Sequence, residues 1–237
     1  MEGIKLFCLP YAGGSATVYS KWRKYLDKDI KLCPIEMPGR SDRSTEPYYN
    51  SVEEAIDDIT NIIMNELEEE SEYAIFGHSM GSIMAYELVC RFKEKNLKPP
   101  MHVFFSGRYP PNIKKERTYK HLLPDAEFEQ EARRFGGMPE NLFRFEGLLK
   151  TAMKTLRADY KVIETYESEP AIHKLNFNIS ALAGTEDVLA TPVEMAEWAN
   201  YTDKQCAFYY FDGGHFYLHN HMEKITQIIN NTLVLNR

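Results

Sequence analysis

The chain contains few cysteines, and their spacing excludes the common metal and disulfide patterns. The four cysteines among its 237 residues are Cys8, Cys33, Cys90 and Cys206. They are widely scattered, and no pair has the short spacing of a zinc or redox motif. Isolated thiols in apolar segments are typical of buried free cysteines in a reducing compartment. We therefore expect a cytoplasmic protein that binds no metal.

Long apolar runs and an excess of positive charge are also missing. No segment approaches the roughly 18 apolar residues of a membrane span. The apolar run after Met1-Glu2-Gly3 is too short for a signal peptide. The 28 Lys and Arg residues are outnumbered by 35 Asp and Glu residues, which gives a net charge of −7. Because cationic side chains supply most of the affinity for phosphate backbones, we expect neither a membrane nor a nucleic-acid partner.

The sequence lacks the usual nucleotide-binding motifs. The first apolar run is followed by Pro10-Tyr11-Ala12-Gly13-Gly14-Ser15-Ala16. A Gly-Gly loop after a first strand could hold a phosphate, but the G-x-G-x-x-G spacing and a Gly-Lys-Ser/Thr sequence are both absent. We expect no nucleotide cofactor. The other interpretation is a loop that presents a backbone N–H group to a negatively charged oxygen.

The features that are present indicate a globular α/β protein. Hydrophobic residues make up 43% and charged residues 27% of the chain, as in ordinary soluble domains. Short apolar runs alternate with helical patterns, and no repeat or linker divides the chain. We predict one domain over residues 1–237, of the α/β class, with a mostly parallel, doubly wound sheet. The expected strands are Ile4–Leu9, Ile30–Ile35, Tyr73–Phe76, Met101–Phe105, Phe177–Leu182 and Ala207–Phe211.

The segment from Tyr109 to about Tyr166 contains no convincing strand. Helical patterns cover Ala126–Phe135 and Asn141–Tyr166, and Gly136-Gly137-Met138-Pro139 separates them. A long helical insertion between two strands is a common way to build a cover over a binding site. We predict that residues 109–166 form a lid. The alternative is a pair of ordinary crossover helices.

The sequence Gly77-His78-Ser79-Met80-Gly81 matches the G-x-S-x-G pattern of a nucleophile elbow. Its context fits a strand, a sharp turn and a helix. Tyr73–Phe76 is short and apolar, and Ile83, Leu88 and Phe92 follow at helical spacing. The elbow would expose the hydroxyl group of Ser79 above the N-terminus of the helix. The alternative is a plain strand–helix turn in which Ser79 caps the helix.

Two further residues at strand ends complete a candidate catalytic triad. Ser79, Asp187 and His215 occur in the chain order typical of the α/β-hydrolase fold. The carboxyl ends of parallel strands meet at one edge of a sheet. We expect His215 to act first as a general base and then as a general acid, and Asp187 to orient its imidazole. Glu186 is the alternative orienting acid.

Catalysis by such a triad also requires donors for the oxyanion. We expect the backbone N–H of Met80 to be one donor. The loop after the first strand would supply the second, from Ala12 or from the adjacent Tyr11. The remaining polar residues near these strand ends, which we expect to serve packing, turns or the surface, are His78, Asp212, His219 and His221.

Taken together, six motifs resemble the type II thioesterases, which are editing enzymes of non-ribosomal peptide and polyketide synthases. The resemblance runs from the first strand to the last helix. It implies hydrolysis of acyl or aminoacyl thioesters on the phosphopantetheine arm of a carrier protein, with a lid and without a metal or nucleotide. The motifs are Leu9-Pro10-Tyr11-Ala12-Gly13-Gly14-Ser15, Met37-Pro38-Gly39-Arg40, Gly77-His78-Ser79-Met80-Gly81, Gly136-Gly137-Met138-Pro139, Leu156-Arg157-Ala158-Asp159-Tyr160 and Asp212-Gly213-Gly214-His215-Phe216.

The partners implied by this resemblance are acyl- or peptidyl-carrier protein domains, and we expect a monomeric enzyme. Because carrier domains are typically acidic, a local basic patch would favour docking. The candidate patch is Arg108, Lys114, Lys115, Arg117 and Lys120, although a solvated face would look the same. Two alternatives stay open. One is an esterase or acyltransferase of the same fold that acts on small esters or coenzyme A thioesters, and the other is a non-catalytic binding scaffold.

Overall fold

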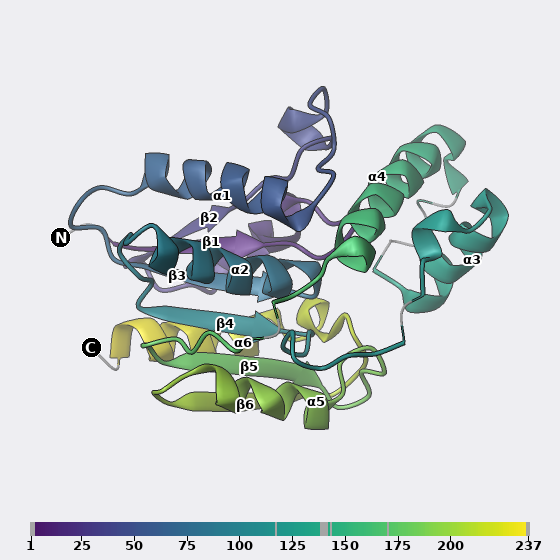
Figure 1. The fold of residues 1–237 in the computed structure, drawn as a ribbon. Coiled ribbons are helices and arrows are strands. Elements are labelled where there is room, and N and C mark those ends of the chain that lie inside the picture. Colours follow the sequence, from purple (N-terminus) through teal and green to yellow (C-terminus); the bar gives the residue numbers. More distant parts are fainter. Residues whose placement is uncertain (1–2, 117, 138–141, 143, 170, 236–237) are drawn as a thin grey trace.

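A single six-stranded parallel sheet forms the centre of the computed structural model, which describes residues 3–116, 118–137, 142, 144–169 and 171–235. The strand order is β2-β1-β3-β4-β5-β6 (Figure 1), and every neighbouring pair is parallel. The strands are β1 (Ile4–Leu9), β2 (Ile30–Pro34), β3 (Tyr73–His78), β4 (His102–Ser106), β5 (Ile179–Gly184) and β6 (Cys206–Phe211). The predicted α/β class and parallel sheet are confirmed.

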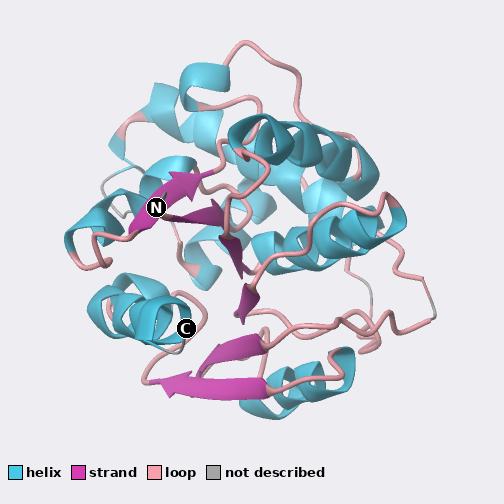
Figure 2. Ribbon diagram, turned by 90° about the vertical axis from the view of Figure 1, so that its left-hand side faces the viewer, coloured by secondary structure: helices cyan, strands magenta, loops and turns pink. Residues whose placement is uncertain are grey.

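Helices cover both faces of this sheet (Figure 2). The central strands β1, β3, β4 and β5 are buried along their whole length, which is why they appear in the sequence as largely apolar runs. The covering helices are α1 (Val52–Glu66), α2 (Met80–Glu94), α5 (Pro192–Ala196) and α6 (Met222–Asn230), with the 3-10 helix η1 (Ala16–Lys24). Apolar residues of α1, α2 and α5 pack on one face, and those of η1 and α6 pack on the other.

The chain order of the strands creates a switch point between β1 and β3. The chain runs from β1 outward to β2 and then returns to pair β3 against the other side of β1. Loops that leave two neighbouring strands at such a point diverge and form a crevice. The loop after β1 and the turn after β3 therefore lie side by side, and these are the segments that carry Ala12 and Ser79.

Two helices of the insertion lie beyond the carboxyl ends of the strands (Figure 1). They are α3 (Asp125–Phe135) and α4 (Glu146–Thr165), and the short 3-10 helix η3 (Lys120–Leu122) precedes them. The described part of residues 109–166 contains no strand, as predicted. The second helix begins later than predicted, at Glu146. Asn141, Met138 and Pro139 of the predicted motifs lie outside the described residues.

The insertion is unevenly anchored to the rest of the protein. The buried residues of α4 are Thr155, Leu156, Asp159 and Val162, all at or beyond the middle of the helix. In α3 only Phe128 and Ala132 are buried. Within the described residues, no helix combines the length and apolar character that are needed to cross a bilayer.

Candidate active site

The turn that carries Ser79 has the backbone geometry of a nucleophile elbow. β3 ends directly before Ser79, and α2 begins directly after it. Ser79 adopts φ 55° and ψ −113°, a region that side-chain-bearing residues rarely occupy and that marks functional strain. A Cβ atom at Gly77 would lie 2.2 Å from the carbonyl oxygen of Gly81, and one at Gly81 would lie 2.1 Å from that of Leu9. Both glycines of the motif are thus required by close backbone contacts.

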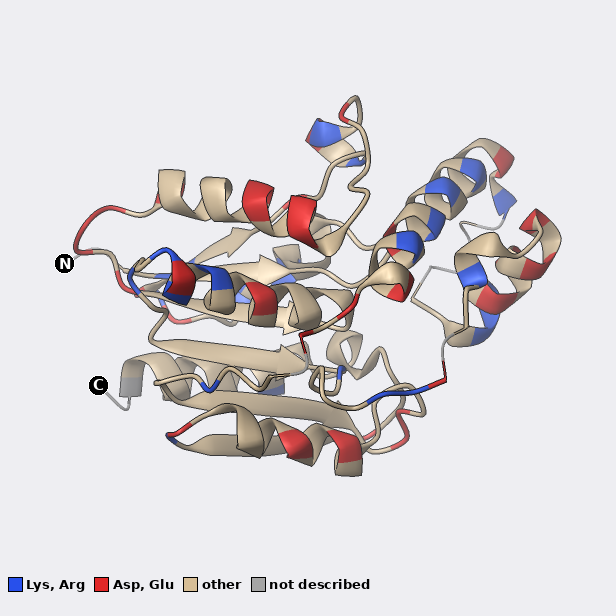
Figure 3. Cartoon of the chain, in the orientation of Figure 1, with Lys and Arg blue, Asp and Glu red and all other residues tan. Residues whose placement is uncertain are grey.

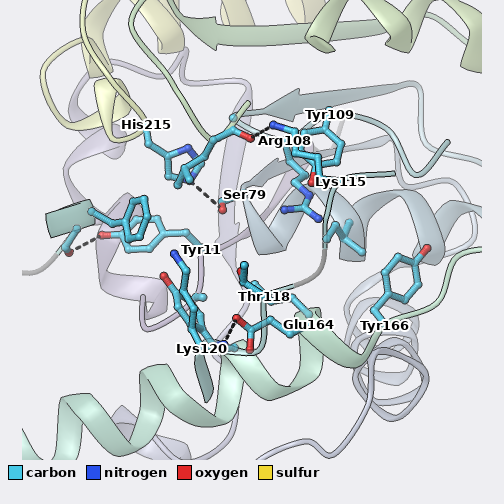
Figure 4. A pocket seen from close by; sticks show the side chains of 18 of the residues that line it. Tyr11, Ser79, Arg108, Tyr109, Lys115, Thr118, Lys120, Glu164, Tyr166 and His215 are labelled. Carbon is cyan, nitrogen blue, oxygen red and sulfur yellow. Dashed lines mark hydrogen bonds between the residues drawn. The ribbon is translucent and has the colours of Figure 1, made fainter. Parts of the chain in front are cut away.

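Ser79, His215 and Asp187 form a continuous hydrogen-bonded series. The Nε2 atom of His215 lies 2.9 Å from Oγ of Ser79 (Figure 4). Its Nδ1 atom lies 2.8 Å from Oδ2 of Asp187. The three side chains follow β3, β6 and β5, so the parallel sheet brings their strand ends together. This arrangement can move a proton from the serine hydroxyl to imidazole while a carboxylate stabilises the imidazolium.

The Asp187 carboxylate is buried and fully hydrogen-bonded. It is 2% exposed. Its Oδ1 atom accepts hydrogen bonds from the backbone N–H groups of Leu189 at 2.8 Å and Ala190 at 3.1 Å. A buried charge is tolerated only when such partners replace water. The adjacent Glu186 is exposed, so the geometry favours Asp187 as the group that orients His215.

The two expected oxyanion donors lie on either side of the switch point. Met80 is the first residue of α2, and the first N–H groups of a helix have no acceptor within it. Ala12 and Ser79 line the same cavity. β1 and β3 are neighbours, and the loop after β1 makes a tight turn in which Gly14 N–H donates to the Tyr11 carbonyl at 2.9 Å. The arrangement suits an oxyanion hole, and the role of the two N–H groups stays a prediction.

A buried ion pair holds this loop against α4. Oδ2 of Asp159 accepts hydrogen bonds from Gly13 N–H at 2.7 Å and from Nη1 of Arg40 at 2.8 Å. Its Oδ1 atom accepts from Nη2 of Arg40 at 2.7 Å. Nη1 of Arg40 also donates to the Gly14 carbonyl at 2.7 Å. We call Gly13, Gly14, Arg40 and Asp159 the loop clamp.

The sequence did not indicate the loop clamp, although both of its charged residues lie in recognised motifs. Arg40 and Asp159 are 119 positions apart, and neither motif by itself names its partner. Their side chains are 8% and 7% exposed. Removing one member of so buried a pair typically costs about 3–5 kcal/mol, because the other charge is left without compensation. The clamp therefore links the position of the loop beside Ser79 to the insertion.

The other histidines near the triad have structural surroundings. His78 is buried, and its Nδ1 atom lies 2.8 Å from Oγ of Ser106. Burial, together with the nearby histidines, holds its pKa well below the ordinary value. His219 is exposed and hydrogen-bonds the hydroxyl of Tyr11 at 3.1 Å. His221 precedes α6 and bonds a backbone carbonyl at 2.8 Å. Among the described histidines, only His215 bonds to Ser79.

Ser79 and His215 open into a cavity of about 360 Å³ (Figure 4). This volume is within the range of small-molecule sites. The insertion supplies much of the wall opposite the triad. The apolar lining residues include Ile83, Tyr109, Phe135, Leu156, Ile163 and Phe216. Across the described ranges, no group of three or more histidine, cysteine or acidic residues is placed to hold a metal ion.

The basic patch predicted from the sequence is divided in the structure. Lys115 pairs with Glu194 at 2.7 Å, and Lys120 pairs with Glu131 at 2.9 Å. Arg108 lines the cavity, and Arg117 lies outside the described residues. The predicted patch is therefore partly neutralised by neighbouring acids.

A second group of basic residues lies along α4 (Figure 3). Lys150, Lys154 and Lys161 recur at helical spacing and are exposed, so they share one side of the helix. We call these three lysines the α4 stripe. Other residues of the same helix, including Leu156 and Ile163, line the cavity. The stripe therefore lies on a helix that borders the candidate site.

Comparison with known proteins identifies related sequences and folds. A family model for the thioesterase domain matches residues 4–233. Linear gramicidin dehydrogenase LgrE of Brevibacillus parabrevis is 35% identical, over 97% of this chain and 88% of its own. Thioesterase PikA5 of Streptomyces venezuelae is 34% identical, over 100% of this chain and 83% of its own. The solved structure of the type II thioesterase BorB from the borrelidin biosynthetic cluster superposes with a TM-score of 0.88 at 35% identity, over 98% of this chain and 93% of its own.

Proposed function

The chain belongs to the thioesterase family, and we propose that it hydrolyses acyl and aminoacyl thioesters on the phosphopantetheine arm of acyl- or peptidyl-carrier protein domains. The observation that carries this proposal is the hydrogen-bonded series Ser79–His215–Asp187, which opens into a cavity. Relatives named as a thioesterase and as a type II thioesterase of a biosynthetic cluster support it. Such an enzyme would clear stalled or wrongly primed peptide and polyketide synthases.

The first half of the reaction transfers the acyl group to the enzyme. Oγ of Ser79 attacks the thioester carbonyl carbon while Nε2 of His215 takes the hydroxyl proton. The backbone N–H groups of Met80 and Ala12 stabilise the negative charge on the carbonyl oxygen. The carbon–sulfur bond then breaks, and the thiol of the arm leaves with the proton from His215. The product is an ester on Ser79.

The second half releases a carboxylic acid. His215 takes a proton from water, which attacks the Ser79 ester, and then returns that proton to the serine oxygen. Asp187 stabilises the imidazolium in both halves. We propose that no cofactor takes part beyond the phosphopantetheine that the substrate carries.

The name of the Brevibacillus relative denotes an oxidoreductase, which is a different reaction class. A nicotinamide-dependent enzyme of the doubly wound type uses a glycine-rich loop after its first strand, with the spacing G-x-G-x-x-G. The corresponding loop here is Pro10-Tyr11-Ala12-Gly13-Gly14-Ser15, which does not match that spacing. Its Gly13 and Gly14 are engaged by the loop clamp. We therefore favour hydrolysis for this chain.

One experiment separates the carrier-directed hydrolase from its alternatives. The same acetyl group is presented on a carrier protein, on coenzyme A and as a simple ester, and kcat/KM is measured for each. We expect the carrier-bound thioester to be preferred, and Ser79→Ala to lower its turnover by about a thousandfold or more. A circular dichroism spectrum of the variant controls for folding. A preference for the free ester would support the esterase alternative, and no labelling by a fluorophosphonate would support the binding scaffold.

We further propose that the carrier domain docks against the α4 stripe. Carrier domains are typically acidic, and complementary charge speeds association. Lys150, Lys154 and Lys161 are exposed on a helix that borders the cavity. A carrier bound there would sit beside the route by which its arm reaches Ser79.

The insertion is proposed to act as a lid with one fixed end. The second half of α4 is held by the loop clamp and by buried side chains, whereas α3 contributes only Phe128 and Ala132 to the interior. Amides of α3 and of the first half of α4 should therefore lose hydrogen-exchange protection before those of β3 and β4. Equal protection across α3 and the sheet would contradict a moving lid.

A further inference from the structure

Arg108 is a cation without an anionic partner in the cavity that contains Ser79. It follows β4 and lines the cavity. Its Nε atom is buried and has no hydrogen-bond partner. Within the described ranges, its guanidinium forms no ion pair, whereas the nearby Lys115 and Lys120 pair with Glu194 and Glu131. Arg108 therefore differs from Lys115 and Lys120. Lys114 also lines the cavity, but it is exposed and donates to the hydroxyl of Ser168.

The surroundings of Arg108 leave its hydrogen-bonding edge free. Its Cζ atom lies 4.3 Å from the centre of the Tyr109 ring, which is a cation–π contact with the face of the guanidinium group. Such stacking does not use the N–H donors at the edge of the group. Burial lowers the pKa of Arg108, and the weaker opposing effects of Tyr109, Tyr166 and Glu194 do not offset it. A cation that is shielded from water and has no ion-pair partner destabilises the protein, and a ligand that supplies the opposite charge would remove this cost.

The position of Arg108 indicates which part of a substrate would meet it. Figure 4 shows the guanidinium group extending into the cavity, on the opposite side of Ser79 from His215 in that view. A general acid must lie close to the leaving group that it protonates. The arm of the carrier therefore leaves on the His215 side. The acyl chain extends the other way, toward Arg108.

We propose that Arg108 binds a carboxylate at the far end of the acyl group, so that the enzyme selects thioesters of dicarboxylic acids. A guanidinium group matches a carboxylate with two parallel hydrogen bonds. The apolar walls near Leu156 and Ile163 would accommodate the methylene groups between the two ends. The inference rests on the proposed thioesterase function and specifies its substrate class.

The test compares matched acyl groups on one carrier protein. Malonyl, glutaryl and adipoyl thioesters are paired with propanoyl, pentanoyl and hexanoyl thioesters, and kcat/KM is measured for each. For the best-fitting chain length, Arg108→Met should lower the ratio of dicarboxylic to monocarboxylic rates by about tenfold or more, the effect of a charge-assisted hydrogen bond. Rates with the monocarboxylic partner should fall much less than rates with the dicarboxylic one, because the monocarboxylic chain has no group for the guanidinium to bind. The control Lys115→Met should keep the wild-type ratio.

Two results would overturn the proposal. An equal loss of kcat/KM with both classes of acyl group would mean that Arg108 contacts the phosphopantetheine arm that they share. An unchanged ratio of dicarboxylic to monocarboxylic rates, with no loss in either, would mean that Arg108 does not bind the acyl group. Arg108→Lys keeps the positive charge but loses the two parallel N–H donors of the guanidinium group, so it should give an intermediate ratio. Monocarboxylic turnover reports folding of each variant. Absence of turnover in the wild type with every thioester would contradict the thioesterase function itself.

Discussion

The carboxyl edge of the sheet and the insertion that faces it are built in different ways. At the edge, Asp187 is buried and accepts two backbone hydrogen bonds in addition to its bond with His215. In the insertion, α3 and the first half of α4 bury few residues and expose many charges. The edge of the sheet is suited to holding the triad in one geometry, and the insertion is suited to binding a particular partner. Changes in the triad should alter the rate with every acyl group, whereas changes on the exposed side of the insertion should alter binding of the carrier protein.

The largest effect is expected at the orienting acid. Asp187→Asn should lower kcat by about 10⁴-fold, because a neutral amide favours the wrong tautomer of His215 and cannot stabilise its cation. Glu186→Gln changes the neighbouring acid, which is exposed, and should leave kcat within about twofold. Steady-state turnover of an acetyl carrier protein measures both. A larger loss in the Glu186 variant would reverse the assignment.

The sheet should also be the acid-sensitive region, because it buries a neutral histidine. His102 on β4 is buried, and burial lowers its pKa to about 4, whereas an unfolded histidine has a pKa of about 6.5. Below pH ~6.5 the unfolded chain therefore binds a proton that the folded chain does not. The contribution of His102 to the free energy of unfolding should fall by about 3 kcal/mol as the pH drops from ~6.5 to ~4 and should be intact above that range. Buried His78, whose pKa is also lowered, should act in the same direction.

Urea unfolding at several pH values between neutral and acidic conditions measures this contribution. His102→Gln should flatten the dependence. Ser180→Ala removes the hydroxyl that bonds His102 at 2.8 Å but keeps the buried imidazole, so it should retain the wild-type slope. Identical slopes in the His102 variant and the wild type would show that acid acts elsewhere.

The loop clamp joins the two regions, so its loss should have an intermediate effect. Asp159→Asn removes the charge that holds Arg40 and weakens the bond to Gly13 N–H. The loop carrying Ala12 should shift, and kcat should fall by about 10–100-fold with KM little changed, somewhat less than for complete loss of an oxyanion donor. The affinity for a trifluoromethyl ketone analogue of the transition state should fall by the same factor as kcat/KM.

Arg157 provides the matched control for the clamp. It lies on the same helix and donates to the carbonyl groups of His121 and Leu123 in the insertion. Arg157→Gln should loosen the insertion without moving the loop beside Ser79, and kcat should stay within about threefold. Equal losses of kcat in the Asp159 and Arg157 variants would mean that the clamp only stabilises α4 and does not position the loop beside Ser79.

The smallest effect is expected at the α4 stripe. Replacing Lys150 and Lys154 with glutamate should raise KM for a carrier protein by about two- to fivefold at low salt and leave kcat unchanged. The difference should shrink at high ionic strength, because exposed charges are screened. The same reversal at Lys93 and Lys95, exposed at the end of α2, is the control. A loss that is independent of salt would argue against electrostatic docking.

Much of the fold and the order of the triad could be predicted from local patterns. Central parallel strands are buried on both faces, so β1, β3, β4 and β5 are largely apolar runs in the sequence. The elbow was visible because its two glycines are imposed by backbone contacts within a few residues or with the neighbouring strand. Asp187 and His215 were predicted because functional groups gather at the carboxyl ends of strands.

Features that depend on distant partners could not be predicted in this way. The pairing of Arg40 with Asp159 joins two segments that only the folded chain brings together. The sequence could not show that the Nε atom of Arg108 lacks a hydrogen-bond partner, because this depends on which distant residues surround it in the folded chain. In the sequence Arg108 belonged to a cluster of basic residues. The structure pairs two of them, Lys115 and Lys120, with acids and places Arg108 in the wall of the cavity.

The most direct test of the account is detection of the acyl-enzyme. Wild-type protein and an acetyl carrier protein are mixed, quenched on the millisecond scale and analysed by peptide mass spectrometry. We predict that the acetyl group appears on Ser79 before free acetate accumulates, and that Ser79→Ala carries none. Hydrolysis that proceeds at the wild-type rate with the acetyl group never on Ser79 would contradict the proposed mechanism.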